Sequence, residues 1–132
     1  MKKIKYICCC ILLLIIIDIT NTKAIVNLND IRFFIRVSEK YDSDYTLEWE
    51  NILKERNNIL KFIRNNDLYE EYKEYTNIMK NKSLFRTKRN YVKKLNYYIE
   101  NNDIRKIKRY LKLILNIFIE ENKYLVERFN VN

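Results

Sequence analysis

A run of ten residues near the end of the chain, residues 110–119, places the strongest constraint on the fold. It contains eight apolar residues and only two polar ones, Lys112 and Asn116. These two are four positions apart, so on a helix they occupy one narrow stripe and leave the rest of the circumference apolar. A helix of this kind must be covered by neighbours on several sides. We therefore expect residues 110–119, within a longer helical segment 104–129, to be the buried axis of the domain, and the first turns of that segment, residues 105–109, to be exposed.

The preceding part of the chain predicts four shorter amphipathic helices that surround this axis. Apolar residues recur three or four positions apart, and short runs rich in Asn, Asp and Ser separate the segments. We expect helices over residues 25–40, about 44–64, about 68–79 and 84–100. The expected N-caps are Asn29-Asp30, Ser43 or Asp44, Asp67 in a capping box with Glu70, and 101–103 before the last helix.

The complete absence of Gly and Pro narrows the choice of fold further. Tight hairpins and phosphate-cradling loops depend on Gly, so both are disfavoured, although the same composition also resembles coding by an A/T-rich genome. The fold class we predict is all-α, a compact bundle of about five helices. A short array of helix-pair repeats is the alternative, because Asn-Asp followed by an aliphatic residue recurs at 29–31, 66–68 and 102–104. The third unit lacks a second helix, which favours the bundle.

The first 24 residues have the three-part pattern of a secretory signal peptide. Basic residues precede an apolar run at 7–17, and Thr22 and Ala24 are small residues at the positions that a signal peptidase reads. The apolar run is shorter than the roughly 20 residues of a membrane-spanning helix. We expect a signal peptide over 1–24, a single helical domain over 25–132, and secretion or export. The alternative is a membrane anchor formed by an uncleaved signal.

The residue types after the signal segment argue against an enzyme. The chain has no His, and its three Cys residues all lie at positions 8–10. Common nucleophile–base pairs, zinc sites and thiol chemistry require these residues. We therefore expect no catalytic residue, no metal site and no cofactor.

Charge is distributed unevenly along the chain. Residues 25–76 contain eight basic and eleven acidic residues, whereas residues 77–132 contain fourteen basic and five acidic residues. Two helical stripes collect many of these basic residues, and we predict that they form a surface for an anionic membrane or another polyanion. The alternative is a solvated helix face. The candidate residues are Lys82, Arg86, Arg89, Lys93, Arg105, Lys108, Arg109 and Lys112.

The leading functional expectation is a protein-interaction or structural module with a protein partner that the sequence does not identify. Trp49, the only tryptophan, is expected to anchor the core, with a place in an interface as the alternative. Asn81 begins the sequon Asn-Lys-Ser and is a candidate glycosylation site. Homo-oligomerisation through surplus apolar surface is a further alternative. Nucleic acid is not an expected partner, because no aromatic platform or recognised groove-binding helix is present.

Overall fold

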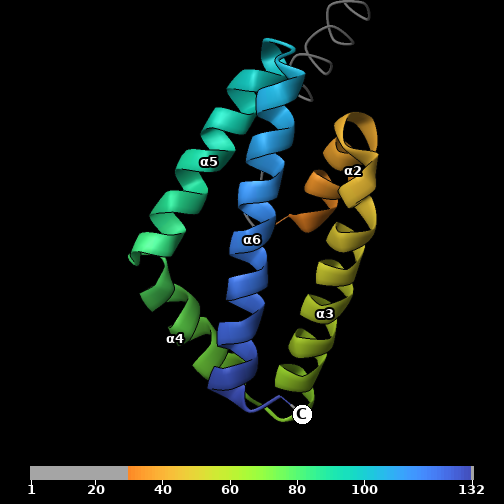
Figure 1. Cartoon of the computed structure of the whole chain (residues 1–132). Coiled ribbons are helices and arrows are strands. Elements are labelled where there is room, and N and C mark those ends of the chain that lie inside the picture. Colours follow the sequence, from red (N-terminus) through yellow and green to blue (C-terminus); the bar gives the residue numbers. More distant parts are fainter. Residues whose placement is uncertain (1–29, 132) are drawn as a thin grey trace, which may run out of the picture.

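The computed structural model describes residues 30–131, which fold into five α-helices and one 3₁₀ turn with no strand in this range (Figure 1). The prediction of an all-α bundle of about five helices is confirmed. The predicted signal peptide and residues 25–29 of the first predicted helix lie outside the described residues. The elements are α2 (Ile31–Tyr41), η1 (Ser43–Tyr45), α3 (Thr46–Asn65), α4 (Tyr69–Met79), α5 (Ser83–Glu100) and α6 (Ile104–Phe129).

Helix α6 lies in the middle of the bundle, with α2 and α3 on one side and α4 and α5 on the other (Figure 1). The path of α3 is parallel to α6, since Tyr45 contacts Lys112 and, further along both helices, Ile52 contacts Asn122. The path of α5 is antiparallel to α6. Segments far apart in the sequence therefore meet on α6.

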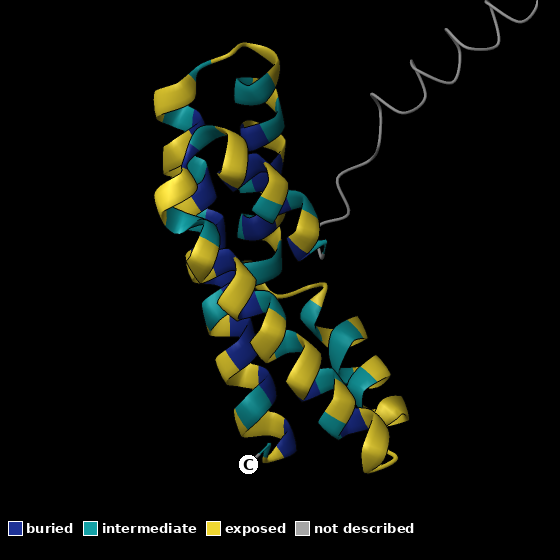
Figure 2. Cartoon of the chain, turned by 90° about the vertical axis from the view of Figure 1, so that its right-hand side faces the viewer, coloured by how far each residue is buried: buried dark blue, intermediate teal, exposed yellow. Residues whose placement is uncertain are grey.

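The prediction that residues 110–119 form a buried axis is confirmed. Five of the ten residues are buried, whereas Lys112 and Asn116 are exposed as the pattern requires. Figure 2 shows the same division along the bundle, with buried residues on the faces that the helices turn toward one another. The buried residues of this run are Leu111, Ile114, Leu115, Ile117 and Phe118.

Three aromatic residues from three helices fill the centre of the core. Trp49 of α3 stacks on Phe34 of α2 with ring centroids 5.1 Å apart, and it meets Phe118 of α6 edge to face at 5.7 Å. All three side chains are fully buried, and the indole Nε1 of Trp49 has no hydrogen-bond partner among the described residues. Trp49 therefore serves as a core anchor and is not available to an exposed interface in this structure.

Three left-handed residues end helices in a chain that has no glycine for these positions. Asp67, Asn102 and Asn130 have φ values of 57°, 51° and 49°. After α3, the Leu68 N–H donates to the Ile63 carbonyl at 3.0 Å, and after α5 the Asp103 N–H donates to Tyr98 at 3.0 Å. These are the bonds of a Schellman motif, in which Asn or Asp replaces the usual Gly.

Two of the four predicted caps are correct. The side chain of Asp30 accepts from the Arg32 N–H at 3.1 Å, and that of Asp103 accepts from the Lys106 N–H at 3.2 Å. The predicted capping box at Asp67 is wrong, because this residue takes the left-handed position and Leu68 is the N-cap of α4. The predicted caps Ser43 and Asp44 are also wrong, since they lie within η1 and Tyr45 precedes α3.

The matching segments 63–68 and 99–104 occupy their turns in different registers. In sequence, Asp67 corresponds to Asp103, but the left-handed residue of the second turn is Asn102. Residues at matching positions of the two segments therefore have different backbone conformations. The similarity reflects a shared preference for Asn and Asp in turns, and it gives no support to the repeat-array alternative.

Replacing Asp67 with Gly is expected to stabilise the protein by roughly 0.5–1 kcal/mol, because Gly has no Cβ to clash in the left-handed conformation. Gly also increases the conformational entropy of the unfolded chain, but this opposing effect is smaller. The measurement is urea unfolding. Asn66→Gly is the control, since Asn66 has a φ of −109° and its side chain donates to the Phe62 carbonyl at 2.9 Å. A gain in the control as large as in Asp67→Gly would contradict the explanation.

Candidate functional site

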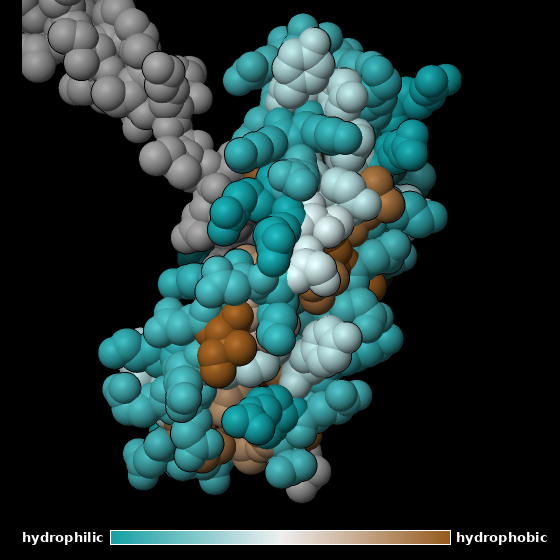
Figure 3. Space-filling model, turned by 90° about the vertical axis from the view of Figure 1, so that its left-hand side faces the viewer, coloured by the Kyte–Doolittle hydropathy of each residue, from teal (hydrophilic) through white to brown (hydrophobic). Residues whose placement is uncertain are grey.

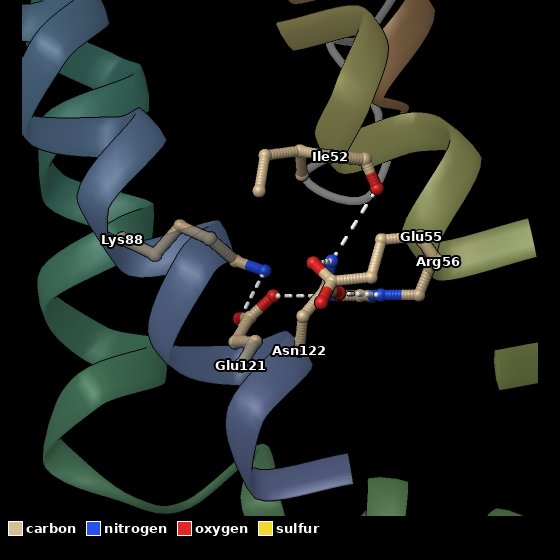
Figure 4. Close-up of polar contacts among 6 residues, drawn as sticks. All are labelled: Ile52, Glu55, Arg56, Lys88, Glu121 and Asn122. Carbon is tan, nitrogen blue, oxygen red and sulfur yellow. Dashed lines mark hydrogen bonds and ion pairs between the residues drawn. The ribbon is translucent and has the colours of Figure 1, made fainter. Parts of the chain in front are cut away.

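A cluster of charged and polar side chains lies inside the bundle, where α3, α5 and α6 meet (Figure 4). Lys88 of α5 and Asn122 of α6 are fully buried, and Glu121 of α6 is 7% exposed. The side chain of Arg56, from α3, is 13% exposed. Charged groups at such depth require close partners, because removing them from water is costly.

The carboxylate of Glu121 joins the three helices. Its Oε1 lies 2.5 Å from the Nζ of Lys88, and its Oε2 accepts from the Nη2 of Arg56 at 3.2 Å. Figure 4 shows Lys88 and Arg56 reaching this carboxylate from opposite sides. We call Arg56, Lys88, Glu121 and Asn122 the buried polar cluster.

Asn122 extends the buried polar cluster toward the backbone and surface of α3. Its Oδ1 accepts from the Nε of Arg56. Its Nδ2 donates to the Ile52 carbonyl at 3.3 Å and to Glu55 Oε2 at 2.8 Å. The amide therefore fixes the guanidinium of Arg56 and connects it to a carboxylate on the exposed side of α3.

Aromatic rings enclose the ammonium group of Lys88. Its Nζ lies 4.4 Å from the centroid of Phe85 and 4.6 Å from that of Phe118, distances suited to cation–π attraction. Burial lowers the pKa of Lys88 below its ordinary value of 10.5, the carboxylate of Glu121 acts in the opposite direction, and Arg56 lowers the pKa further. Desolvation is thus the dominant influence on this lysine.

The lowered pKa of Lys88 predicts a pH dependence of stability. Between this pKa and 10.5 the unfolded chain binds the proton more tightly, so the free energy of unfolding rises with pH across that window. The free energy of unfolding of the natural protein and of Lys88→Met is measured in urea from pH 7 to pH 10.5. As the pH rises, the natural protein should gain stability relative to Lys88→Met. Burial raises the pKa of Tyr72 and Tyr75, which destabilises the fold above pH 10, but both proteins share this effect. A difference that stays constant with pH would contradict the prediction.

An inner cavity of about 170 Å³ lies beside the buried polar cluster, between α4 and the α3–α6 pair. Arg56 and Glu121 form part of its wall. The apolar and aromatic part of the wall consists of Leu60, Tyr72, Tyr75, Met79, Phe85 and Leu125. Thr76 and Lys80 complete the lining, so the cavity combines a few charged side chains with a mostly apolar and aromatic wall, as small-molecule sites do.

An outer cleft of about 720 Å³ lies next to the inner cavity and shares Tyr75 and Met79 with it. Leu84 of α5 and Tyr124 of α6 add apolar surface, while the rim carries charges of both signs. The face formed by α4 and α5 shows hydrophobic surface among hydrophilic side chains (Figure 3). The charged rim residues are Lys82, Glu120, Glu127 and Arg128.

The outer cleft is open because α4 packs loosely. No residue of α4 is buried, in contrast to every other α-helix of the described chain. Tyr72 and Tyr75 reach Phe129 at centroid distances of 6.2 Å and 6.0 Å, which ties the helix to the end of α6. The rest of α4 leaves the cleft uncovered.

All eight predicted polyanion-binding residues are exposed. On α6, Lys108 lies 3.5 Å from Asp42 and Lys112 donates to the Tyr45 hydroxyl at 3.2 Å, so these two side chains turn toward the α2–η1 side. On α5, Arg86 donates to the Asn81 carbonyl at 3.0 Å. Among described residues, no ion pair involves Lys82, the N-cap of α5, or the α5 candidates Arg86, Arg89 and Lys93.

The candidate glycosylation site, Asn81, lies in the exposed turn between α4 and α5, as its sequence position predicts. This turn borders the outer cleft, which Lys82 and Ser83 of the same sequon line. Whether Asn81 is modified stays a prediction from the sequence.

Sequence reasoning missed the buried polar cluster, although a signal was present. Arg56, Lys88 and Glu121 each occupy a position in the apolar repeat of its helix: Arg56 in the series 49–52–56–59–63, Lys88 in 85–88–92–95, and Glu121 in 114–118–121–125. A single charged residue in the apolar stripe of one helix does not show whether its side chain is buried or reaches solvent. Opposite charges in the core stripes of three helices indicate a buried ion cluster.

Neither metal binding nor membrane crossing is indicated within residues 30–131. No group of three or more Cys, Asp or Glu residues there is placed to hold a metal ion. No helix in the same range has both the length and the apolar character needed to span a bilayer. Comparison of the chain with models of protein families, with curated proteins and with solved structures found no match.

Proposed function

We propose that the protein is a helical interaction module whose outer cleft binds a segment of a partner protein. The observation that carries this proposal is the loose packing of α4, which leaves Tyr75, Met79, Leu84 and Tyr124 around an open cleft of about 720 Å³. Grooves between helices commonly accept the apolar face of an amphipathic helix. Mixed charges on the rim favour an orienting polar contact at either edge.

A photo-crosslinking residue at position 83, on the wall of the outer cleft, tests this proposal. The partner captured there is then purified, and its affinity is measured for the natural protein, for Tyr124→Glu and for the control Asn57→Glu on the exposed side of α3. We expect saturable binding that Tyr124→Glu weakens at least tenfold and Asn57→Glu leaves unchanged. Equal affinities for the two variants would overturn the proposal.

A second proposed function is binding to an anionic membrane surface through α5. The supporting observation is that Lys82, Arg86, Arg89 and Lys93 are exposed on one stripe without an ion pair among described residues. Each basic side chain near an anionic bilayer contributes about 1 kcal/mol.

Sedimentation with phosphatidylserine vesicles separates this function from a general effect of net charge. The test variant changes Arg86, Arg89 and Lys93 to Glu, and the matched control changes Lys54, Lys61 and Arg64 of α3, which are also exposed, to Glu. We expect only the α5 variant to lose sedimentation. An equal loss in both variants would show that no specific face is involved.

We propose secretion or export on the basis of the signal-peptide pattern in residues 1–24. N-terminal sequencing of the protein from its native source tests this directly. A first residue of Ile25 supports cleavage, whereas an intact leader in the membrane fraction supports the anchored alternative.

A further inference from the structure

The side of the α5–α6 pair that borders the outer cleft continues beyond it. On α5, Tyr91 lies one turn after the last residue of the cleft lining, and Tyr98 lies two turns further along. On α6, Leu113 and Tyr110 lie two and three turns before the first residue of that lining. Residues three, four or seven positions apart share one side of a helix, so these four residues lie on the same side as the cleft. We call them the tyrosine edge.

Ring contacts hold the two halves of the tyrosine edge together. Tyr110 of α6 meets Tyr91 of α5 edge to face with centroids 5.7 Å apart, and it stacks on Tyr98 at 5.4 Å. All four residues of the edge are half-buried, in contrast to Val92 and Ile107, which are buried in the main core with residues of α2 and α3. The tyrosine edge therefore leaves aromatic surface accessible, and tyrosine is a residue type that interfaces favour.

The charges beside the tyrosine edge differ from those around the cleft. The rim of the cleft carries both signs, whereas the Nζ of Lys94 lies 5.8 Å from the centroid of Tyr110 and Arg109 lies one turn before the leucine of the edge. Lys94 and Arg109 are exposed, and neither forms an ion pair with a described residue. Lys106 is also nearby, but it pairs with Asp103 at 3.5 Å. This end of the surface therefore attracts negative charge.

We infer that the partner segment is an amphipathic helix of about four turns, with acidic side chains at the end that lies against Lys94 and Arg109. From Leu84 in the cleft to Tyr98 the surface spans 14 positions of α5, or roughly 20 Å, the length of such a helix. The acidic residues on the cleft rim oppose a polyanion along the whole surface, so a segment with its acids at one end fits better. This inference rests on the proposed binding of a partner segment in the outer cleft, and it adds the chemistry and direction of that segment.

A displayed library of sixteen-residue peptides tests the inference, with the full chain as the target. Leu is fixed at peptide positions 2, 6, 9 and 13, which share one face of a helix, and the other positions draw equally from Glu, Lys, Gln and Ala. We expect the selected peptides to carry Glu in one terminal turn and to bind with one-to-one stoichiometry. Equal use of Glu and Lys at both ends, or no saturable binder, would overturn the inference.

A charge exchange locates the acidic end of the best peptide. Lys94→Glu combined with Arg109→Glu should weaken its binding at least tenfold, because attraction becomes repulsion. The same double variant should prefer a peptide in which the terminal Glu residues are changed to Lys. The matched control, Lys54→Glu combined with Lys61→Glu, changes exposed residues of α3 by the same charge and should leave both affinities within twofold. Equal effects of the two double variants would overturn the inference.

Tyr124→Glu separates failure of the inference from failure of the proposed function. Peptide binding that Tyr124→Glu weakens, but that the changes at Lys94 and Arg109 do not, would retain the outer cleft as the binding site and overturn only the inference. Peptide binding that Tyr124→Glu leaves unchanged would overturn the proposed function and the inference with it.

Discussion

Replacing Glu121 with Gln is expected to lower the free energy of unfolding by about 3–5 kcal/mol, because breaking a buried ion pair leaves an uncompensated charge in the core. The carboxylate of Glu121 contacts both Lys88 and Arg56. Gln retains the shape of the side chain but removes its charge. The two cations would then face each other across a neutral amide.

Equilibrium unfolding in urea measures this effect, with Glu120→Gln as the adjacent control. Glu120 is exposed and pairs with Lys123 at 2.9 Å, and removal of such a surface pair is expected to change stability by less than about 1 kcal/mol. Lys88→Met should be less harmful than Glu121→Gln, since Glu121 keeps its contact with Arg56. Similar small losses for Glu120→Gln and Glu121→Gln would show that water reaches the cluster.

Replacing Phe118 with Ala is expected to cost about 3–5 kcal/mol, the usual range for deleting a fully buried aromatic side chain. Phe118 packs against Phe34 and Trp49, and its ring also lies 4.6 Å from the Nζ of Lys88. The substitution therefore opens a cavity in the aromatic core and removes one of the rings around the buried lysine. Both effects lower stability.

Thermal and urea unfolding check the prediction for Phe118. Asn116→Ala, two positions away on the exposed stripe of α6, serves as the control and should stay within about 0.5 kcal/mol of the natural protein. A loss for Phe118→Ala well below 3 kcal/mol would mean that the surrounding helices collapse into the space left by the ring.

The helical architecture was predictable because apolar residues recur three or four positions apart over long segments of the sequence. The apolar circumference of residues 110–119 identified the axis, and the two polar residues in that run are exposed as expected. The exact turns were less predictable. Asp favours both the N-cap and the left-handed position, so the sequence alone did not separate Asp103, which caps α6, from Asp67, which ends α3.

The candidate site was less predictable than the fold, because it depends on which helix faces are turned toward one another. The basic residues of α5 and α6 were recognised as charged and helical, yet Lys108 and Lys112 turn toward Asp42 and Tyr45. Lys88 lies in sequence between two predicted surface residues, Arg86 and Arg89, yet its side chain is fully buried. Helical spacing places a residue on a stripe, but only the packing of three helices shows that the stripes of Arg56, Lys88 and Glu121 converge.

The central position of α6 has a consequence for the order of folding. Helices α2 to α5 leave the ribosome before α6, so the α2–α3 pair can form early but its main apolar partner arrives last. Contacts such as that of Arg56 with Asn122 join residues that are 66 positions apart. The entropic cost of closing this loop is offset only by the contacts that form when α6 docks. Until then the apolar faces of α3 and α5 remain uncovered, which is the interval in which a nascent chain is most exposed to aggregation and most dependent on chaperones.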